Sequence, residues 1–372
     1  MKYPNSNLHQ LKSKAPSLIW VVWVGISEMP RYTFVDIFCG AGGSSLGFLR
    51  AGFEPVGAID NYLPAINTYE TNIGIKPIMA DASRFDFAVW TRELGDVDVI
   101  VSCPPCQGFS RLRRNLVGSY DKRNRLVNVL LKAVKNLKPR AVVLENVPGI
   151  VSSNIFKRFL SSIEKLGYHA SFSILEAADY GVPQRRRRLI LVATRNRKLV
   201  DFPPEPTHER GGNNGLPPWR TVRGSIADLP PLKPGEIHPS IPNHACKNLP
   251  ENWLQLIRAI PKDGGSRHQA PRKLLLPAHR KLKSGFCDVF GRLRWDAPSN
   301  TITTGCWDPS RGRFVHPEQD RGLSLRECAR LQGFPDDFVF KGSLSSIARQ
   351  IGEALPPQLA YTVAKSIRYN LP

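Results

Sequence analysis

The chain has 372 residues, of which 41% are apolar and 22% are charged. This length exceeds the size at which one hydrophobic core usually stops growing, so one large and one smaller folded domain are expected. The 52 Lys and Arg residues against 31 Asp and Glu residues give a formal charge of +21. Such an excess favours a polyanionic partner, nucleic acid first, and charge that serves only solubility is the alternative.

Seven cysteines are scattered from Cys39 to Cys328. Their odd number and low density do not suggest a disulfide framework, and a cytoplasmic location is expected. The apolar stretch 18–26 is far too short to span a bilayer, so no membrane association is expected. Because Met29 stands directly before the first predicted strand, residues 1–28 are expected to be a leader outside the core, or to follow a start codon assigned upstream of the true one.

Residues 33–195 alternate between apolar runs and longer mixed segments. Strands are predicted by the runs TFVDIF, PVGAID, VDVIVS, AVVLENV and RLILVAT. Between two of them, apolar residues recur at three- and four-residue steps from Leu126 to Leu137 and stop before Pro139, which predicts a helix. This alternation indicates an α/β fold with helices covering a parallel sheet.

Beyond residue 200 the composition changes. Residues 201–277 are rich in proline, glycine and asparagine and contain few continuous apolar runs, which predicts a loop-rich second module. Order is expected again from Arg292. Helices that can pack back on the first domain are predicted over 325–334 and 350–367.

A glycine-rich turn follows the first predicted strand. The segment 34–43 (FVDIFCGAGG) leads from a strand through this turn into a helix, so its backbone N–H groups can approach a ligand closely. Its spacing does not satisfy the G-x-G-x-x-G of dinucleotide-binding dehydrogenases. Asp60 ends the next predicted strand, where a carboxylate can accept hydrogen bonds from two ribose hydroxyls. A helix N-cap is the alternative role for Asp60.

The segment 102–110 (SCPPCQGFS) follows VDVIVS and therefore lies at the carboxyl end of a strand, where open parallel sheets bind ligands. Pro-Cys-Gln at this position, after FxDxFxGxGG and before ENV, resembles the DNA cytosine-5 methyltransferase family. The order of motifs matches from Phe34 to Ala360. The resemblance implies a Rossmann-like S-adenosylmethionine-dependent methyltransferase fold with a mixed, mostly parallel sheet and a smaller loop-rich target recognition domain.

The resemblance also implies that Cys106 is the nucleophile in methyl transfer to carbon 5 of cytosine. Carbon 5 reacts poorly until a group adds to carbon 6, and a thiolate does this well. Cys103 stands where the family commonly has glycine and is expected to be a bystander. A redox or metal pair of Cys103 and Cys106 is the alternative. The other cysteines supply no second ligand pair at zinc-like spacing, so no metal is expected.

Two further motifs are expected to hold the base. Ring addition is easier when N3 is protonated or hydrogen-bonded, and Glu145, at the end of AVVLE, fits this role. The resemblance implies that it contacts N3 and the exocyclic amine; an ordinary surface glutamate is the alternative. The segment 184–188 (QRRRR) matches the family's Q-x-R-x-R and selects Arg186 and Arg188, of which Arg188 is expected to reach cytosine O2. The two remaining arginines are interpreted as solvated or phosphate-binding.

The resemblance implies the following cofactor contacts: Phe38, Gly40, Gly42 and Gly43 along the methionine, Asp60 at the ribose, Asn61 near the adenine, Asp81 at the adenine amine, and Pro105 in the pocket lining. The family's Gly-Asn-Ala-Val-Pro-Pro appears here as Gly-Glu-Ala-Leu-Pro-Pro. Glu353 therefore replaces an asparagine that lies close to the cofactor. Because a carboxylate would repel the methionine carboxylate, Glu353 is expected to turn away, to gain a cationic neighbour or to weaken cofactor binding.

A base inside a duplex hides carbon 6, so the target cytosine must be turned out of the helix. The basic segment 108–125 suits a loop that closes on phosphates, although an ordinary basic loop is the alternative. Sequence recognition is assigned to about 200–290, with Arg292, Thr301 and Thr303 supporting that module's backbone. The DNA sequence that is recognised does not follow from one chain.

The expected domains are a leader (1–28), a catalytic and cofactor-binding domain (29–200), a target recognition domain (201–320) and C-terminal helices that return to the catalytic domain (321–372). The expected partners are S-adenosylmethionine and duplex DNA, with the protein acting as a monomer and a cognate restriction endonuclease acting separately. Two alternatives stay open: a tRNA cytosine-5 methyltransferase, and a catalytically impaired DNA-binding regulatory protein.

Overall fold

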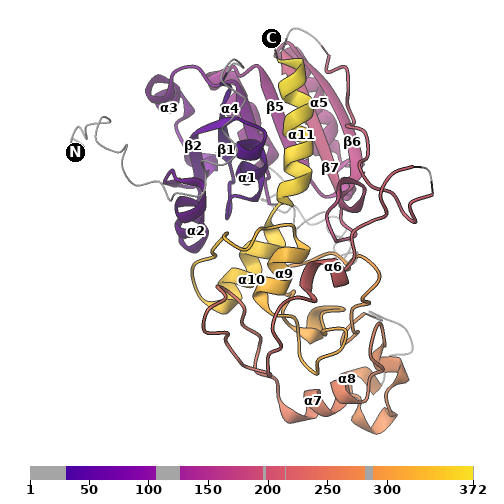
Figure 1. Cartoon of the computed structure of the whole chain (residues 1–372). Coiled ribbons are helices and arrows are strands. Elements are labelled where there is room, and N and C mark those ends of the chain that lie inside the picture. The colour runs from indigo at the N-terminus through magenta and orange to yellow at the C-terminus, as the bar shows by residue number, and fades with distance from the viewer. Residues whose placement is uncertain (1–30, 106–125, 196–197, 214, 281–287, 372) are drawn as a thin grey trace, which may run out of the picture. The chain divides into compact units, whose positions relative to one another are not determined.

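The computed structural model describes residues 31–105, 126–195, 198–213, 215–280 and 288–371, and residues 32–372 form one compact unit. The predicted leader over 1–28, the segment 108–125 and Cys106 lie outside the described residues. The first half of the compact unit is built on a seven-stranded sheet with helices on both faces (Figure 1). The predicted α/β class is therefore confirmed.

The sheet has the strand order β3-β2-β1-β4-β5-β7-β6. Its strands are β1 (Thr33–Ile37), β2 (Glu54–Asp60), β3 (Ile78–Met79), β4 (Val99–Ser102), β5 (Ala141–Asn146), β6 (Tyr168–Glu176) and β7 (Arg187–Arg195). The pairs from β3 to β5 are parallel, whereas β7 is antiparallel to both β5 and β6. The sheet is thus mixed and mostly parallel, as predicted. The apolar pattern did not predict β6, in which buried and exposed positions are mixed.

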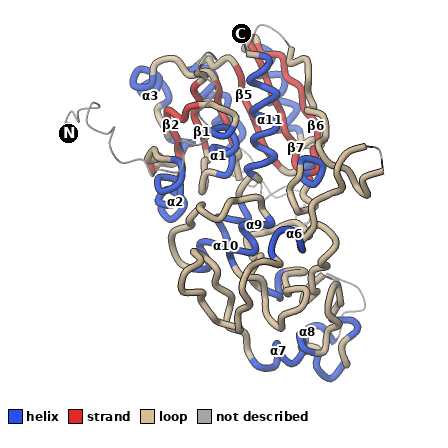
Figure 2. The backbone as a smooth tube through the Cα atoms, in the orientation of Figure 1, coloured by secondary structure: helices blue, strands red, loops and turns tan. Residues whose placement is uncertain are grey.

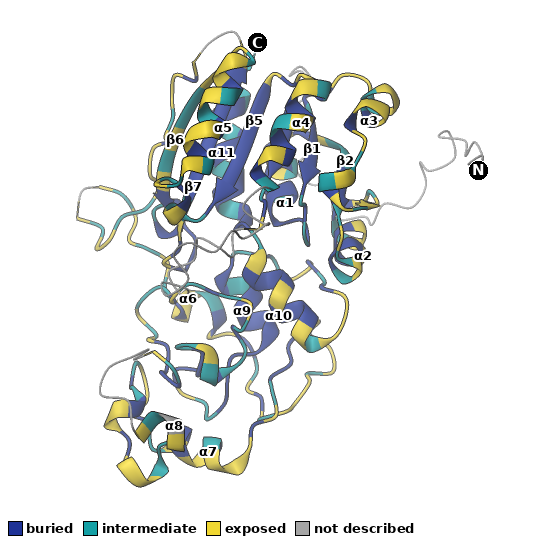
Figure 3. Cartoon of the chain, turned by 180° about the vertical axis from the view of Figure 1, so that it is seen from behind, coloured by how far each residue is buried: buried dark blue, intermediate teal, exposed yellow. Residues whose placement is uncertain are grey.

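Successive residues of the central strands pack into different cores because side chains alternate across a sheet. Ile100 and Val142 pack against one layer, and their neighbours Val101 and Val143 pack against the other. The first layer comprises α3 (Phe87–Leu94), α4 (Val127–Leu137) and α5 (Asn154–Lys165), and the second comprises α1 (Gly43–Arg50) and α11 (Pro357–Asn370). Figure 3 shows the strands buried between these layers.

The chain from 198 to 323 consists mainly of loops, shown in tan in Figure 2. Its helices are short: α6 (Arg223–Ile226), α7 (Glu251–Arg258) and α8 (Pro277–Arg280). Part of this segment has its own core, in which Leu256, Ile257, Phe290 and Val315 are all fully buried. The prediction that this segment is rich in loops is confirmed, and apolar residues of α7 pack into its local core.

Three helices complete the chain: α9 (Leu325–Leu331), α10 (Leu344–Glu353) and α11. The single helix predicted over 350–367 is wrong, because residues 354–356 separate α10 from α11. Pro356 and Pro357 lack backbone N–H groups and cannot continue α10, but proline is well tolerated at the start of the next helix. The close packing of α11 on α1 needs a glycine, since a Cβ on Gly47 would lie 2.5 Å from the Cβ of Ala360.

Helix α2 (Leu63–Ile73) lies between the sheet and the C-terminal helices. Tyr69 and Ile73 share a core with Ile347 and Ile351 of α10. Thr68 donates a hydrogen bond from Oγ1 to Oε1 of Gln350 at 2.6 Å. Among the described residues, no helix is long and apolar enough to cross a membrane.

Candidate active site

Several strands end at one edge of the sheet. The register aligns the last positions of β1 and β4 with buried positions of β2 and β5. The residues that follow in this row are Phe38, Asp60, Cys103 and Glu145. Open parallel sheets bind ligands at this edge, so the strand pattern itself brings together side chains from separate motifs.

The glycine-rich turn after β1 has an unusual backbone. Phe38, Gly40 and Gly42 have φ angles of 65°, 52° and 96°. Glycine adopts such angles easily, but for Phe38 they are costly, and strain of this kind concentrates at functional sites. The backbone N–H of Gly40 donates to Oδ2 of Asp60 at 2.8 Å. A Cβ on Gly40 would meet no atom within 4 Å, so this part of the turn faces open space.

The other two glycines of the turn face the protein. A Cβ on Gly42 would lie 2.9 Å from Cγ1 of Ile73 in α2. A Cβ on Gly43 would lie 2.4 Å from the carbonyl oxygen of Leu355. Gly42 and Gly43 therefore let α2 and the segment after α10 approach the turn. For these two positions the structure shows packing, while their predicted contact with the methionine remains a prediction.

A buried carboxyl group supports the turn from within. Asp36 is fully buried, and its Oδ2 accepts hydrogen bonds from the hydroxyls of Ser44 at 2.5 Å and Ser45 at 2.7 Å. Ser45 also shares a hydrogen bond with the hydroxyl of Tyr69 at 2.8 Å. Burial raises the pKa of Asp36 to about 6, although the two serines act in the opposite direction. Sequence reasoning missed Asp36, and its place inside an apolar strand was the available signal.

Asp60 lies opposite the turn at the end of β2. Besides the bond from Gly40, its Oδ1 accepts the backbone N–H of Tyr62 at 2.9 Å. Burial raises the pKa of Asp60, while the N–H groups of Gly40, Tyr62 and Asn61 lower it. These bonds fix the carboxylate, and its oxygens retain lone pairs that can accept from a ligand.

Asn61 and Asp81, which were predicted near the adenine, are both exposed. Asp81 caps the short 3₁₀ helix Ala82–Arg84, with Oδ1 accepting from the backbone N–H and the hydroxyl of Ser83. These bonds with Ser83 lower the pKa of Asp81. Oδ2 of Asp81 lies 3.9 Å from Nε of Arg84. The capping role is therefore what the structure shows for Asp81, and contact with adenine remains a prediction.

Glu145 and Arg188 form an ion pair at the end of β5. Nε of Arg188 lies 2.8 Å from Oε1 of Glu145, and both side chains are largely buried, with 15% and 10% exposed. One terminal nitrogen of Arg188 also donates to the carbonyl oxygen of Arg187 at 2.8 Å. Because a guanidinium carries five N–H donors, Arg188 can bind Glu145 and still donate to a ligand. The two residues predicted to hold the base thus contact each other directly.

The segment leading to Cys106 is anchored to the same strand end. Nδ2 of Asn146 donates to the carbonyl oxygen of Pro104 at 3.4 Å. Pro104 is buried and Pro105 is exposed at the edge of the described segment. Burial raises the pKa of the Cys103 thiol well above its ordinary range, which makes it a poor thiolate and disfavours a redox pair. Sequence reasoning missed the anchoring role of Asn146.

Arg186 and Arg188 differ in their surroundings. Arg186 is 2% exposed, and its guanidinium donates to the carbonyl oxygens of Ile302 at 2.8 Å, Ala354 at 3.0 Å and Gly352 at 3.2 Å. Arg186 therefore joins β7 to the segment before α9 and to the end of α10. These hydrogen bonds of Arg186 are structural, and its predicted part in catalysis remains a prediction.

The other two arginines of the QRRRR segment, Arg185 and Arg187, are exposed. Arg185 lines a hollow of about 560 Å³ beside the loop-rich segment. The hollow is also lined by Arg210, Gly211, Pro218, Trp219, Thr221, Asp288, Leu293, Arg294, Asp296, Ala297, Pro298, Asn300 and Arg313. Arg313 and the two aspartates form ion pairs with other side chains or with each other. Within the described part of the chain, Arg185, Arg210 and Arg294 form no ion pair, which leaves their cations available to an anionic ligand.

Arg292 supports the loop-rich segment as predicted. It is fully buried and donates to the backbone carbonyl oxygens of Ile257, Ile260, His316 and Gln319. Thr301 donates from Oγ1 to the carbonyl oxygen of Arg185 at 2.7 Å, which ties the segment to β7. The backbone of Thr303 packs closely on Gly352. A Cβ added to Gly352 would lie 2.1 Å from the carbonyl carbon of Thr303.

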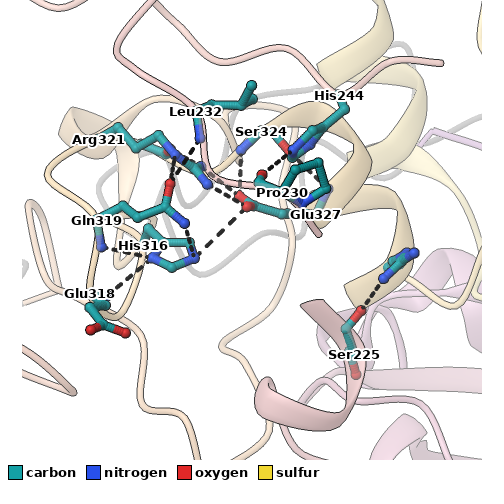
Figure 4. A network of polar contacts seen from close by, with 12 residues as sticks. Ser225, Pro230, Leu232, His244, His316, Glu318, Gln319, Arg321, Ser324 and Glu327 are labelled. Atoms are coloured by element: carbon teal, nitrogen blue, oxygen red, sulfur yellow. Dashed lines mark hydrogen bonds and ion pairs between the residues drawn. The ribbon is translucent and has the colours of Figure 1, made fainter. Parts of the chain in front are cut away.

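A second buried polar network holds the start of α9 (Figure 4). Arg321 and Glu327 are fully or almost fully buried and form a two-bond ion pair at 2.7 and 2.9 Å. His316 lies beside them, with Nε2 3.9 Å from Oε1 of Glu327. Ser324 donates its backbone N–H to Glu327 at 2.7 Å, and its hydroxyl shares a hydrogen bond with His244. This network lies outside the sheet edge and stabilises the fold.

The described residues contain no cluster of three or more His, Cys, Asp or Glu side chains that could hold a metal ion. Glu353, the departure from the family motif, has gained a cationic neighbour. Nε of Arg349 lies 3.1 Å from both of its carboxylate oxygens.

The comparisons with known proteins agree with this geometry. The model of the C-5 cytosine-specific DNA methylases matches residues 32–369, and the chain belongs to this family. Its relatives include type II enzymes. The type II methylase M.HgiDII of Herpetosiphon aurantiacus is 35% identical over 356 residues, covering 90% of this chain and 94% of the relative. The type II methyltransferase M1.HphI of Haemophilus parahaemolyticus is 33% identical over 342 residues, covering 90% and 86%.

A candidate DNA modification methyltransferase encoded within an Escherichia coli prophage has a similar structure. The TM-score is 0.69 at 24% identity, covering 91% of this chain and 99% of the other. This likeness supports the methyltransferase fold. The family resemblance inferred from the motifs and the expected activity, DNA cytosine-5 methylation, are thus confirmed.

Proposed function

We propose that this chain transfers the methyl group of S-adenosylmethionine to carbon 5 of a cytosine turned out of duplex DNA, through a covalent bond to Cys106. The observation that carries the proposal is the buried ion pair of Glu145 and Arg188 in the same edge row as Asp60 and the glycine-rich turn. One edge thus offers a polar cofactor subsite and a polar base subsite side by side.

The residues at the turn fit S-adenosylmethionine. Gly40 faces open space, and Asp60 is held in place by backbone N–H groups with lone pairs left for ribose hydroxyls. Phe38 leaves β1 in a strained conformation beside them. When bound, the cofactor supplies an electrophilic methyl group on a sulfonium. The protein contributes binding, orientation and exclusion of water.

Glu145 and Arg188 would hold the cytosine edge. A carboxylate can accept the exocyclic N–H, and when Glu145 carries a proton it can donate that proton to N3. The ion pair fixes the carboxylate, and a remaining N–H of Arg188 can donate to O2. These contacts select the hydrogen-bonding edge of cytosine. We assign Arg186 a positioning role, because its guanidinium holds the backbone behind this pair.

The covalent step follows from the chemistry of the ring. The thiolate of Cys106 adds to carbon 6 while N3 takes a proton from Glu145, which makes carbon 5 nucleophilic. Carbon 5 then takes the methyl group, and the electron pair of the broken sulfur–carbon bond stays on the sulfur of S-adenosylhomocysteine, which leaves. Loss of the carbon 5 proton to a base expels the Cys106 thiolate, N3 returns its proton to Glu145, and the base passes its proton to water. The ring ends with one new carbon–carbon bond, and the enzyme returns to its starting state.

DNA binding is supported by the hollow beside β7. Arg185, Arg210 and Arg294 are cations without an ion pair in the described part of the chain, and Trp219 adds an aromatic surface. We propose that these arginines bind phosphates of the DNA backbone. The domain limits 29–200, 201–320 and 321–372, action as a monomer, and a separately acting restriction endonuclease belong to the same proposal.

Methyl transfer from labelled S-adenosylmethionine to plasmid DNA and to tRNA tests the proposal, and bisulfite sequencing of the plasmid gives the target sequence. We expect labelled duplex DNA at one recurrent sequence. Cys106→Ser should lower the rate by at least about a thousandfold, because the hydroxyl is a far weaker nucleophile. The matched variant Cys103→Ser should stay within about threefold of the parent. Methylation confined to tRNA, or full activity of Cys106→Ser, would contradict the proposal.

A further inference from the structure

Glu353 brings a negative charge to the cofactor edge. It is the last residue of α10, and the next residues pack on the glycine-rich turn. A Cβ on Gly43 would lie 3.2 Å from the Cβ of Ala354 and 2.4 Å from the carbonyl oxygen of Leu355. Burial raises the pKa of Glu353, and the negative charge of Asp60 acts in the same direction. Two negative groups thus border one cofactor site.

Arg349 forms an ion pair with Glu353. Its Nε lies 3.1 Å from each oxygen of Glu353, one helical turn further along α10. Burial raises the pKa of Asp60 and of Glu353, and the positive charge of Arg349 lowers both. Arg349 therefore pairs directly with Glu353 of α10, and its positive charge also acts on Asp60 of β2.

An aromatic ring holds the guanidinium in place. The Cζ atom of Arg349 lies 4.2 Å from the ring centre of Tyr62, which is a close cation–π contact. Tyr62 follows Asp60 by two residues, and its hydroxyl donates to Oγ of Ser346 in α10 at 2.7 Å. Arg349 is still 47% exposed, so part of it remains accessible to a ligand. An exposed ion pair four residues apart contributes little to stability.

We propose that Arg349 is the charge-balancing residue of the cofactor site, which allows this chain to carry a carboxylate at position 353 beside the amino-acid end of S-adenosylmethionine. With Arg349 present, Glu353 is neutralised and does not repel the α-carboxylate of the ligand. Without it, Glu353 faces that carboxylate uncompensated. The inference rests on the proposed use of S-adenosylmethionine.

Calorimetric titration of the full chain with S-adenosylmethionine and S-adenosylhomocysteine tests this role. Arg349→Gln should weaken binding of both ligands by about tenfold. The double variant Arg349→Gln with Glu353→Gln should return to within about threefold of the parent, because the unpaired carboxylate is gone. Binding of 5′-methylthioadenosine, which lacks the amino-acid carboxylate, should change by less than about twofold in every variant.

Glu353→Gln alone keeps the cation and should bind S-adenosylmethionine at least as tightly as the parent. A thermal melt of each variant checks folding, and this single variant tests the inference even if Arg349→Gln does not fold. Loss of affinity in Glu353→Gln, or no rescue in the double variant, would overturn the role of Arg349. Failure of the parent to bind either cofactor ligand would instead overturn the proposed function.

Discussion

At the scale of single residues, neighbours in the sequence have different roles. Arg186 and Arg188 are two residues apart at the start of β7, yet Arg186, just before the strand, holds three backbone carbonyl groups and Arg188 pairs with Glu145. The motif predicted that both lie at the site, but which side chain faces the strand end depends on the pairing of β7 with β5. Exposed Arg185 and Arg187 agree with their interpretation as solvated or phosphate-binding residues.

Arg294→Gln tests the assignment of DNA phosphates to the hollow. We expect weaker binding to every duplex sequence and a slope of log affinity against log salt that is smaller by about 1, because one phosphate contact is lost. Fluorescence anisotropy at several salt concentrations measures both quantities. Arg158→Gln, which removes an exposed arginine of α5 outside the hollow, is the control. An unchanged slope in Arg294→Gln, or an equal change in the control, would exclude a phosphate contact by Arg294.

At the scale of elements, local patterns predicted five of the seven strands. The five apolar runs became β1, β2, β4, β5 and β7, because strands buried on both faces of a sheet need continuous apolar residues. Strand β6 escaped prediction since exposed positions interrupt its pattern. The start of α9 illustrates another limit. Ser324 and Glu327 form a capping box visible in the sequence, but the burial of Arg321 against Glu327 arises from tertiary packing.

The pairing around Glu327 predicts a pH-dependent stability. Burial raises the pKa of Glu327, but Arg321 outweighs it and lowers the value to about 2, below the ordinary 4.5. The contribution of the ionised Glu327 to the free energy of unfolding is therefore fully present above pH 4.5, and it is lost as the pH falls toward 2. Burial lowers the pKa of His316 from 6.5 to about 4. As the pH falls, the imidazole of His316 therefore takes up a proton in the unfolded chain before it does so in the folded protein. The free energy of unfolding should fall from pH 6.5 to 4 through His316.

Glu327→Gln should lower the free energy of unfolding by about 3–5 kcal/mol at pH 7, because it leaves Arg321 buried without a counter-ion. It should also flatten the pH dependence below 4.5. Urea denaturation between pH 4 and 7 measures the first effect and the His316 window. Glu251→Gln, which breaks the exposed pair with Arg258, should cost about 1 kcal/mol or less. Equal effects of the two substitutions would show that burial of the Arg321 pair does not matter.

At the scale of the whole molecule, the sequence predicted which residues meet at one sheet edge. It did so because parallel strands end together and because the order of motifs resembled one family. It did not predict how α10 completes that edge. Arg349 reaches Tyr62 only because α10 packs on α2, and contacts between segments nearly 300 residues apart leave no local pattern. A cationic neighbour for Glu353 was one of three alternatives expected from the sequence, and the structure shows Arg349 in that place.

The central claim is that a bond forms between Cys106 and the cytosine ring. A duplex carrying 5-fluorocytosine at the methylated position tests it directly, because fluorine cannot leave as a proton does and release of the enzyme stalls. After incubation with S-adenosylmethionine and proteolysis, mass spectrometry should find the modified nucleotide on Cys106 in the parent and in Cys103→Ser. A nucleotide attached to another residue, or rapid methyl transfer without any trapped complex, would contradict the account.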